Sequence, residues 1–284
     1  MSKFNREKFT LPKFVGHYIE EWETREPQDA LSTGIDSLDE ILNGGLAPGH
    51  IFTVGAETGN GKSAFGVNMA RRVAAEGKPV CFFTFEMTVT ALHARVNQNL
   101  SGVNSTRIQN KSYAEEETQC VADAYAYIKE LPLVITTGSY LTPENMGDVM
   151  EIFVEEMGIE LFVFDYIQVM AKGMSDAKQF KVEEVMCSIR ESAKERVECP
   201  CLVLSQLNRE AGKRGEPNIY DLRDSGAVEN NSDIVGLLDP ATTRPWHGRT
   251  GFSLKIVKQR EGECGDVPLI FVPHKVEFLD GAGT

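Results

Sequence analysis

The sequence has no apolar stretch that could cross a membrane. A spanning helix needs about 20 consecutive, mostly apolar residues, and none of the hydrophobic runs in these 284 residues approaches that length. The first residues also lack the basic segment and apolar run of a secretory leader. We therefore expect a cytoplasmic protein that has no membrane partner.

Patterns of metal ligands and disulfides are also missing. The six cysteines form no CxxC pair, and several of them lie inside apolar runs. The five histidines are scattered along the chain, so a zinc site has little support. This cysteine usage is typical of reduced thiols in a cytosol.

An excess of basic residues is the third absence. The formal net charge is −13 at pH 7, which argues against the broad basic face of duplex-binding modules. Single strands are not excluded, because a ring or filament of subunits can hold one through a few loop contacts from each copy. There are no internal repeats or low-complexity segments, so one large domain is expected.

The chain alternates apolar runs with segments of helical periodicity. This alternation predicts an α/β fold, a mostly parallel sheet with helices on both faces, with ligands at the carboxyl ends of the strands. Thr142 and Pro143 are expected as the N-cap and first residue of one helix. The expected strands are 51–54, 80–86, 133–135, 161–164, 201–205, 234–238, 252–257 and 268–272. The expected helices are 37–42, the segment after the glycine-rich loop to about 76, 88–100, 106–110, 114–130, 143–157 and 181–198.

A glycine-rich loop, GAETGNGKSAF over residues 55–65, joins an apolar run to an amphipathic segment. Its small residues let backbone N–H groups face a triphosphate, and the following helix directs its positive end to the same place. Lys62 would reach the β- and γ-phosphates, and the Ser63 hydroxyl would bind Mg²⁺. The strict P-loop pattern has Gly where Ala56 stands, a difference of one methyl group. The expected contacts with ATP or another NTP are Ala56, Glu57, Thr58, Gly59, Asn60, Gly61, Lys62 and Ser63.

Three polar residues follow strands of the predicted sheet. Glu86 closes the strand after the P-loop helix, Asp165 closes LFVF, and Gln206 follows CLVLS. Because the carboxyl ends of parallel strands meet at one edge, we expect all three near Lys62 and Ser63. Asp165 would hold Mg²⁺, Glu86 would orient and deprotonate the attacking water, and Gln206 would sense the γ-phosphate.

A basic turn, Lys258-Gln259-Arg260, follows a late strand. From the residues alone two interpretations stay open: a solvated turn, or cations that stabilise a transferring phosphoryl group within or between subunits. Two loops also combine Gly with Lys or Arg, which suits contact with nucleic acid phosphates. They are residues 171–181 and the segment after Gln206, which runs through Arg209, Lys213, Arg214 and Arg223 to Gly226.

Five motifs together resemble the DnaB-type replicative DNA helicases. They are FTFEM (83–87), DYIQVM (165–170), SQLNR (205–209), DLRDSGAVENNSD (221–233) and KQREG (258–262), in that family's order and spacing. The resemblance covers about residues 30 to 280. It implies a RecA-like P-loop ATPase core with late antiparallel strands. It also implies a homo-oligomer, usually a hexameric ring, that moves 5′ to 3′ on single-stranded DNA.

Carried over by motif, the phosphate, magnesium and catalytic roles given above are retained. Lys258 and Arg260 match the pair that reaches the nucleotide of the adjacent subunit, and Arg223, Asp224 and Gly226 match the loop that tracks the DNA backbone. A primase, a helicase loader and other replisome proteins are the implied partners. Asp224 stands where the family usually has Glu, and the glycine-rich loop is more similar to that of RadA-type recombinases. A RadA-like recombination ATPase that binds single-stranded DNA therefore stays the alternative.

Residues 1–30 are expected to form an arm and a linker-type helix ahead of a motor domain over residues 31–284. Apolar residues recur at helical spacing between Phe14 and Trp22, where the family's linker helix docks on its neighbour. We expect no counterpart of the N-terminal domain of replicative helicases, because about thirty residues cannot replace it. This expectation favours a phage or plasmid replication system in a bacterial host cell.

Overall fold

The computed structural model describes residues 19, 23, 30–172, 181–208, 217–222, 224–240 and 249–282. The expected arm over residues 1–30 lies almost wholly outside these ranges, and so does the helix between Phe14 and Trp22. Most of the two expected nucleic-acid loops also lies outside them, including Arg209, Lys213, Arg214 and Arg223. Within the described ranges no helix is long and apolar enough to cross a membrane.

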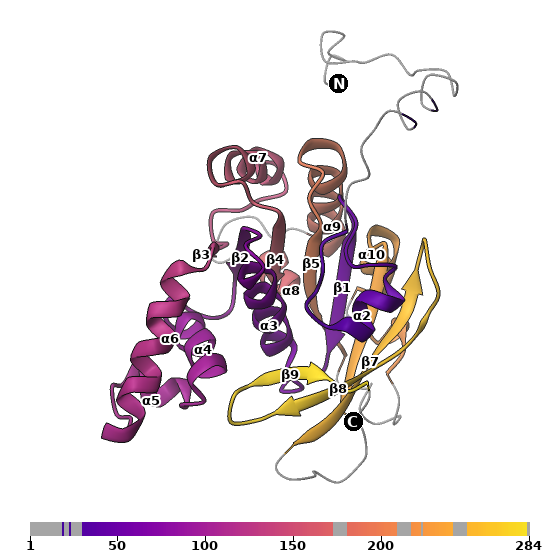
Figure 1. The fold of residues 1–284 in the computed structure, drawn as a ribbon. Helices are drawn as coiled ribbons and strands as arrows, with labels where there is room; N and C mark the ends of the chain where they lie inside the picture. Colours follow the sequence, from indigo (N-terminus) through magenta and orange to yellow (C-terminus); the bar gives the residue numbers. More distant parts are fainter. Residues whose placement is uncertain are drawn as a thin grey trace.

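One sheet of nine strands runs through the described part of the chain (Figure 1). The strand order is β3-β2-β4-β5-β1-β6-β7-β8-β9, in which the first six strands are parallel and the last three antiparallel. This confirms the predicted α/β core with late antiparallel strands; β9 is a strand that the sequence analysis did not predict. The bounds are β1 Ile51–Ala56, β2 Val80–Thr84, β3 Leu133–Thr137, β4 Leu161–Asp165, β5 Cys201–Gln206, β6 Ile234–Pro240, β7 Thr250–Gln259, β8 Gly265–Val272 and β9 Glu277–Asp280.

Helices cover both faces of the parallel sheet, as predicted (Figure 1). Successive residues of a strand point to opposite faces, so Phe82 packs in the cluster that contains α3, whereas Phe83 packs with α7 and α9. The helices are α2 Asp36–Ile41, α3 Lys62–Ala75, α4 Val89–Ser101, α5 Ser105–Gln109, α6 Thr118–Glu130, α7 Met146–Met157, α8 Ile167–Lys172, α9 Val182–Glu191 and α10 Ser225–Asn231. Short 3₁₀ turns lie at Glu115–Glu117 and Ile219–Asp221, and a π turn at Ser192–Arg196 continues α9.

Helix α7 begins later than the sequence predicts. Thr142 is not its N-cap and Pro143 is not its first residue, because the helix starts at Met146, after Asn145. The Thr142 N–H donates to Asn145 Oδ1 at 2.7 Å, and the Asn145 N–H donates to Thr142 Oγ1 at 3.3 Å. These reciprocal bonds close a turn over residues 142–145, which competes with the helix at these positions.

The antiparallel strands bring the C-terminal end of the chain onto α3. Phe278 of β9 is fully buried and meets Phe65 of α3 edge to face, with ring centroids 5.9 Å apart. Asn68 of α3 accepts the Phe278 N–H at 2.7 Å and donates to the Val276 carbonyl at 3.0 Å. The helix that starts at the glycine-rich loop is therefore held by the parallel sheet and by the last strand.

Candidate nucleotide-binding site

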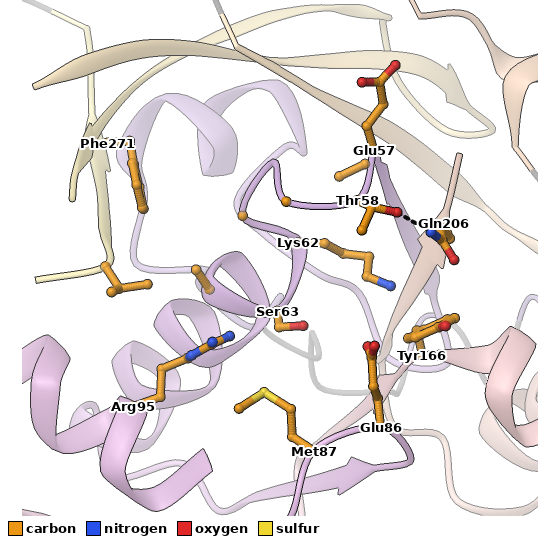
Figure 2. Close-up of a pocket in the computed structure, with 15 residues that line it drawn as sticks. Glu57, Thr58, Lys62, Ser63, Glu86, Met87, Arg95, Tyr166, Gln206 and Phe271 are labelled. Atoms are coloured by element: carbon orange, nitrogen blue, oxygen red, sulfur yellow. Dashed lines mark hydrogen bonds between the residues drawn. The ribbon is translucent and has the colours of Figure 1, made fainter. Parts of the chain in front are cut away.

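A cavity of about 470 Å³ lies where the parallel strands end. β1 ends at Ala56 and β5 at Gln206, and both residues line the cavity beside the loop between β1 and α3. Figure 2 shows side chains from four elements converging there, Lys62 and Glu86 among them. The lining consists of Ala56, Glu57, Thr58, Gly59, Gly61, Lys62, Ser63, Ala64, Glu86, Met87, Arg95, Tyr166, Gln206, Phe271 and Val276.

The loop from β1 into α3 turns through two glycines with positive φ. The angle is 91° at Gly59 and 82° at Gly61, a region that residues with side chains rarely adopt. Gly61 also lies against β9, because a Cβ added there would be 2.8 Å from the Phe278 ring. The Asn60 N–H donates to the Glu57 carbonyl at 3.1 Å and closes the turn. Asn60 does not line the cavity, unlike the other loop residues expected to contact nucleotide.

Lys62 opens α3, and its side chain is only 11% exposed. The ammonium lies 3.9 Å from Asp165 Oδ1 and 3.6 Å from the centre of the Tyr166 ring. Burial lowers the pKa of Lys62 from 10.5 to about 8, against the attraction of the Asp165 and Glu86 carboxylates. A cation that is desolvated in this way gains strongly from phosphate oxygens.

Asp165 ends β4 and is fully buried. Neither carboxylate oxygen makes a hydrogen bond of ordinary geometry to the described residues. Burial raises the pKa of Asp165, while the Lys62 ammonium and the Ser63 hydroxyl lower it. A buried carboxylate with free acceptor positions beside a hydroxyl offers the oxygen donors that Mg²⁺ prefers. These residues therefore fit the cation that the sequence predicts.

Glu86 stands on a turn rather than at a strand end, because β2 stops at Thr84 and not at the predicted residue 86. Thr84 Oγ1 donates to the Met87 carbonyl at 2.9 Å and accepts the Met87 N–H at 3.2 Å. The Phe85 N–H donates to the Asp165 carbonyl at 2.8 Å. These bonds hold the exposed Glu86 at the cavity, with its carboxylate toward Lys62 in Figure 2. An exposed carboxylate has the access to water that a general base requires.

Gln206 connects the end of β5 to the phosphate loop. Its side-chain amide donates to the Thr58 hydroxyl, the contact drawn in Figure 2. Its backbone N–H donates to Gln168 Oε1 at 3.2 Å, and Gln168 Nε2 donates to Ser205 Oγ at 2.8 Å. A change in the phosphate loop would therefore be felt directly at the end of β5.

Three lining residues do not belong to the motifs: Arg95 on α4, Phe271 on β8 and Val276 before β9. In Figure 2 the Arg95 guanidinium points toward Ser63 and adds a second cation to the cavity. Arg95 lies nine residues after Glu86 on a predicted helix, a spacing that the sequence displays. The approach of Phe271 and Val276 depends on the strand order, which the sequence does not display.

Lys258 and Arg260 do not line the cavity. β7 runs antiparallel to β6 and pairs Gln259 with Ile234, which in turn pairs with Phe52 near the start of β1. The basic turn therefore lies beside the amino ends of the parallel strands, at the edge opposite to the phosphate loop. Burial and the nearby Arg260 lower the pKa of Lys258.

The described part of the expected DNA loop is at the surface. Asp224 precedes α10 and Gly226 lies in its first turn, and both are exposed. Neither lines the nucleotide cavity. Arg223, the cation of this loop, lies outside the described residues.

Comparison with known proteins gives a family and a full-length reference. The family model described as "DnaB-like helicase C terminal domain" matches residues 30–280. The replicative DNA helicase DnaB of Pasteurella multocida (strain Pm70) is 31% identical over 250 residues, which cover 85% of this chain and 53% of that protein. The chain thus spans about half the length of this curated relative.

Two solved structures share the fold. One is described as an ATPase domain and superimposes with a TM-score of 0.78 at 20% identity, covering 94% of this chain and 96% of that one. The DnaB-like replicative helicase whose structure was determined together with "its interactions with primase" gives a TM-score of 0.77 at 20% identity, over 93% of this chain and 65% of that one. At these identities the likeness shows the fold. The match over residues 30–280 runs from before the phosphate loop to beyond the basic turn, and on it this chain belongs to the DnaB-like helicase C-terminal domain family.

Proposed function

We propose that this chain is the ATP-driven motor of a 5′ to 3′ DNA helicase. It would move along single-stranded DNA as a homo-oligomeric ring, most simply a hexamer, during DNA replication. Membership of the DnaB-like family supports the class of motor, and the geometry of the two sheet edges supports the ring.

The separation of those edges is the observation that carries the proposal. Lys62 and Asp165 lie at the carboxyl edge, whereas Lys258 and Arg260 lie at the amino edge. Ile51–Ala56 of β1 spans five residue steps of about 3.3 Å, so the edges are about 16 Å apart. A Lys or Arg side chain cannot bridge that distance. The basic pair therefore reaches a nucleotide only in another copy, and such a head-to-tail contact closes into a ring.

Within one site the proposed roles follow the placement of each side chain. Lys62 binds the β- and γ-phosphate oxygens, and Glu86 orients the attacking water and accepts its proton. Ser63 and Asp165 would hold Mg²⁺, which when bound neutralises charge on the phosphates. Gln206 bonds to the phosphate loop and would report the γ-phosphate to the segment that follows β5.

The DNA strand would be held by Arg223, Asp224 and Gly226, because the two described members of this set are exposed and lie away from the nucleotide cavity. A primase, a helicase loader and other replisome proteins are the proposed partners; a structural neighbour solved with its interactions with primase supports that class. We place the reaction in the cytoplasm of a bacterial host cell. The recombination alternative has less support, since the family and the curated relative are of the helicase type.

Strand displacement from forked DNA tests the proposal. Forks carrying only a 5′ tail or only a 3′ tail are incubated with the full chain, Mg²⁺ and ATP, and hydrolysis is followed in the same tubes. We expect displacement that requires the 5′ tail and is lost in Glu86→Gln. Hydrolysis stimulated by single strands, without displacement of either fork, would reject unaided unwinding and favour the recombination ATPase or a need for a loader.

A further inference from the structure

One short helix holds both cations of the basic turn. Lys258 Nζ donates to the Glu229 carbonyl, and Arg260 Nη2 donates to the Asn230 carbonyl at 3.0 Å. Both carbonyls belong to the last turn of α10, where backbone oxygens have no partner within the helix. The negative end of a helix also attracts cations. The position of α10 therefore determines where the two side chains rest.

Asp233 gives Arg260 a second, fixed contact. The Arg260 N–H donates to the Asp233 carbonyl at 3.0 Å, and Arg260 Nε lies 3.7 Å from Asp233 Oδ1. Asp233 is buried and also accepts from Lys194 Nζ at 2.7 Å and from the Ile51 N–H at 3.0 Å. These bonds fix Asp233 to the start of β1. The backbone of Arg260 is thus anchored, and its guanidinium is shared between the anchor and α10.

The opposite end of α10 is open. Asp224, at the N-cap position, has a φ of 57° and its side chain caps no N–H. Asp224 and Gly226 are exposed, and a Cβ added to Gly226 would have no atom within 4 Å. Between the two ends, Val228 is fully buried in the core cluster. A helix of seven residues is about 10 Å long, so one rigid element connects the open end to the cations.

We propose that α10 is a positioning element that makes the presentation of Lys258 and Arg260 depend on single-stranded DNA. Contact at Asp224 and Gly226 shifts α10 about its buried Val228, and the carbonyls of the last turn move the two cations toward the adjacent nucleotide. The inference rests on the proposed function and adds its regulation: hydrolysis between subunits is fast where DNA occupies the open end of α10.

Glu229 provides a matched pair of variants. Glu229→Ala and Glu229→Gly both remove the carboxylate, but only Gly loosens the helix, by an amount that corresponds to about a fivefold change in helix population. We expect DNA-stimulated ATP hydrolysis by the full chain to be about fivefold lower in Glu229→Gly than in Glu229→Ala. Hydrolysis without DNA, affinity for an oligo-dT strand and oligomeric state should be the same in both. If Glu229→Gly does not fold, Asn230→Gly and Asn230→Ala give the same comparison at an exposed side chain.

The outcomes separate this inference from the function on which it rests. Equal DNA stimulation in the Gly and Ala variants, at equal DNA affinity, overturns the role of α10 and leaves the motor intact. A parallel loss of DNA affinity in the Gly variant also overturns it, because α10 would then serve binding alone. A wild-type chain whose hydrolysis does not respond to DNA rejects the proposed function and this inference together.

Discussion

Raising the pH should stabilise the nucleotide-free chain relative to a variant without the buried charge pair, Lys62→Met/Asp165→Asn. Burial lowers the pKa of Lys62 from 10.5 in the unfolded chain to about 8 in the folded chain. Between these values the unfolded chain binds a proton that the folded chain has released. Stability rises with pH wherever the unfolded state binds more protons, so the wild type gains on the variant above pH 8. Below that pH Lys62 is protonated in both states and contributes no slope.

The expected gain is about 3 kcal/mol over the whole window. Each pKa unit corresponds to about 1.36 kcal/mol, and the interval between the two pKa values of Lys62 is about 2.5 units. Most of the gain, about 2.5 kcal/mol, should be present by pH 10. The Lys62 side chain is 11% exposed, so screening by solvent removes little of it. The double variant also removes the carboxylate of Asp165, whose own pKa would otherwise rise once the ammonium is gone.

Urea unfolding of both proteins at a series of pH values from about 7 to 10 measures this difference, provided that the denaturant dependence is the same for both. The titration of exposed groups is shared by the two proteins and cancels. Saturating nucleotide should abolish the rise, because phosphate oxygens keep Lys62 protonated. A wild-type advantage that stays constant across the series would refute the assignment of Lys62 as a desolvated cation.

Three further predictions test other parts of the molecule. Lys62→Ala and Arg260→Ala should each be inactive in ATP hydrolysis, whereas an equal mixture should regain up to about a quarter of the sites, since random assembly pairs an intact Lys62 with an intact Arg260 at that frequency; no recovery in mixed rings would contradict action between subunits. Glu86→Gln should bind nucleotide like the wild type but hydrolyse it about 10² to 10⁴ times more slowly, so equal turnover in a single-turnover assay would exclude Glu86 as the base. Phe278→Ala should lower the free energy of unfolding by about 3 to 5 kcal/mol and weaken nucleotide binding through Gly61, and a variant as stable as the wild type would show that β9 does not hold α3.

The phosphate site could be predicted because its determinants are local in sequence. The loop residues need φ values that glycine supplies, and Lys62 and Ser63 follow from the spacing of that loop. Asp165 and Gln206 could be placed at the same edge because parallel strands put their carboxyl ends together. Glu86 was assigned to the end of a strand that stops two residues earlier, and it still lies at the cavity because the turn after β2 is bonded to the Asp165 backbone.

The rest of the site depends on contacts between distant segments. β9 is short, and its place over α3 arises from the antiparallel ribbon and from Phe278, neither of which has a periodic pattern. Phe271 and Val276 reach the cavity only because that ribbon folds back over the phosphate loop. The late start of α7 arises in another way, from a side-chain turn at Thr142 and Asn145 that outcompetes a favourable helix start.

The basic turn shows how strand pairing decides between two interpretations that the residues alone leave open. A solvated turn would leave Lys258 and Arg260 in water, but both donate to carbonyls of α10. A carbonyl is a neutral acceptor, and a phosphate oxygen forms a charge-assisted bond about twice as strong. Cations that rest on carbonyls can therefore transfer to a phosphate, whereas cations fully committed to carboxylates would be retained. Lys258 rests on a carbonyl and Arg260 keeps a 3.7 Å contact with Asp233, so of the two, Lys258 should move more easily and Arg260 should return the pair to its resting place.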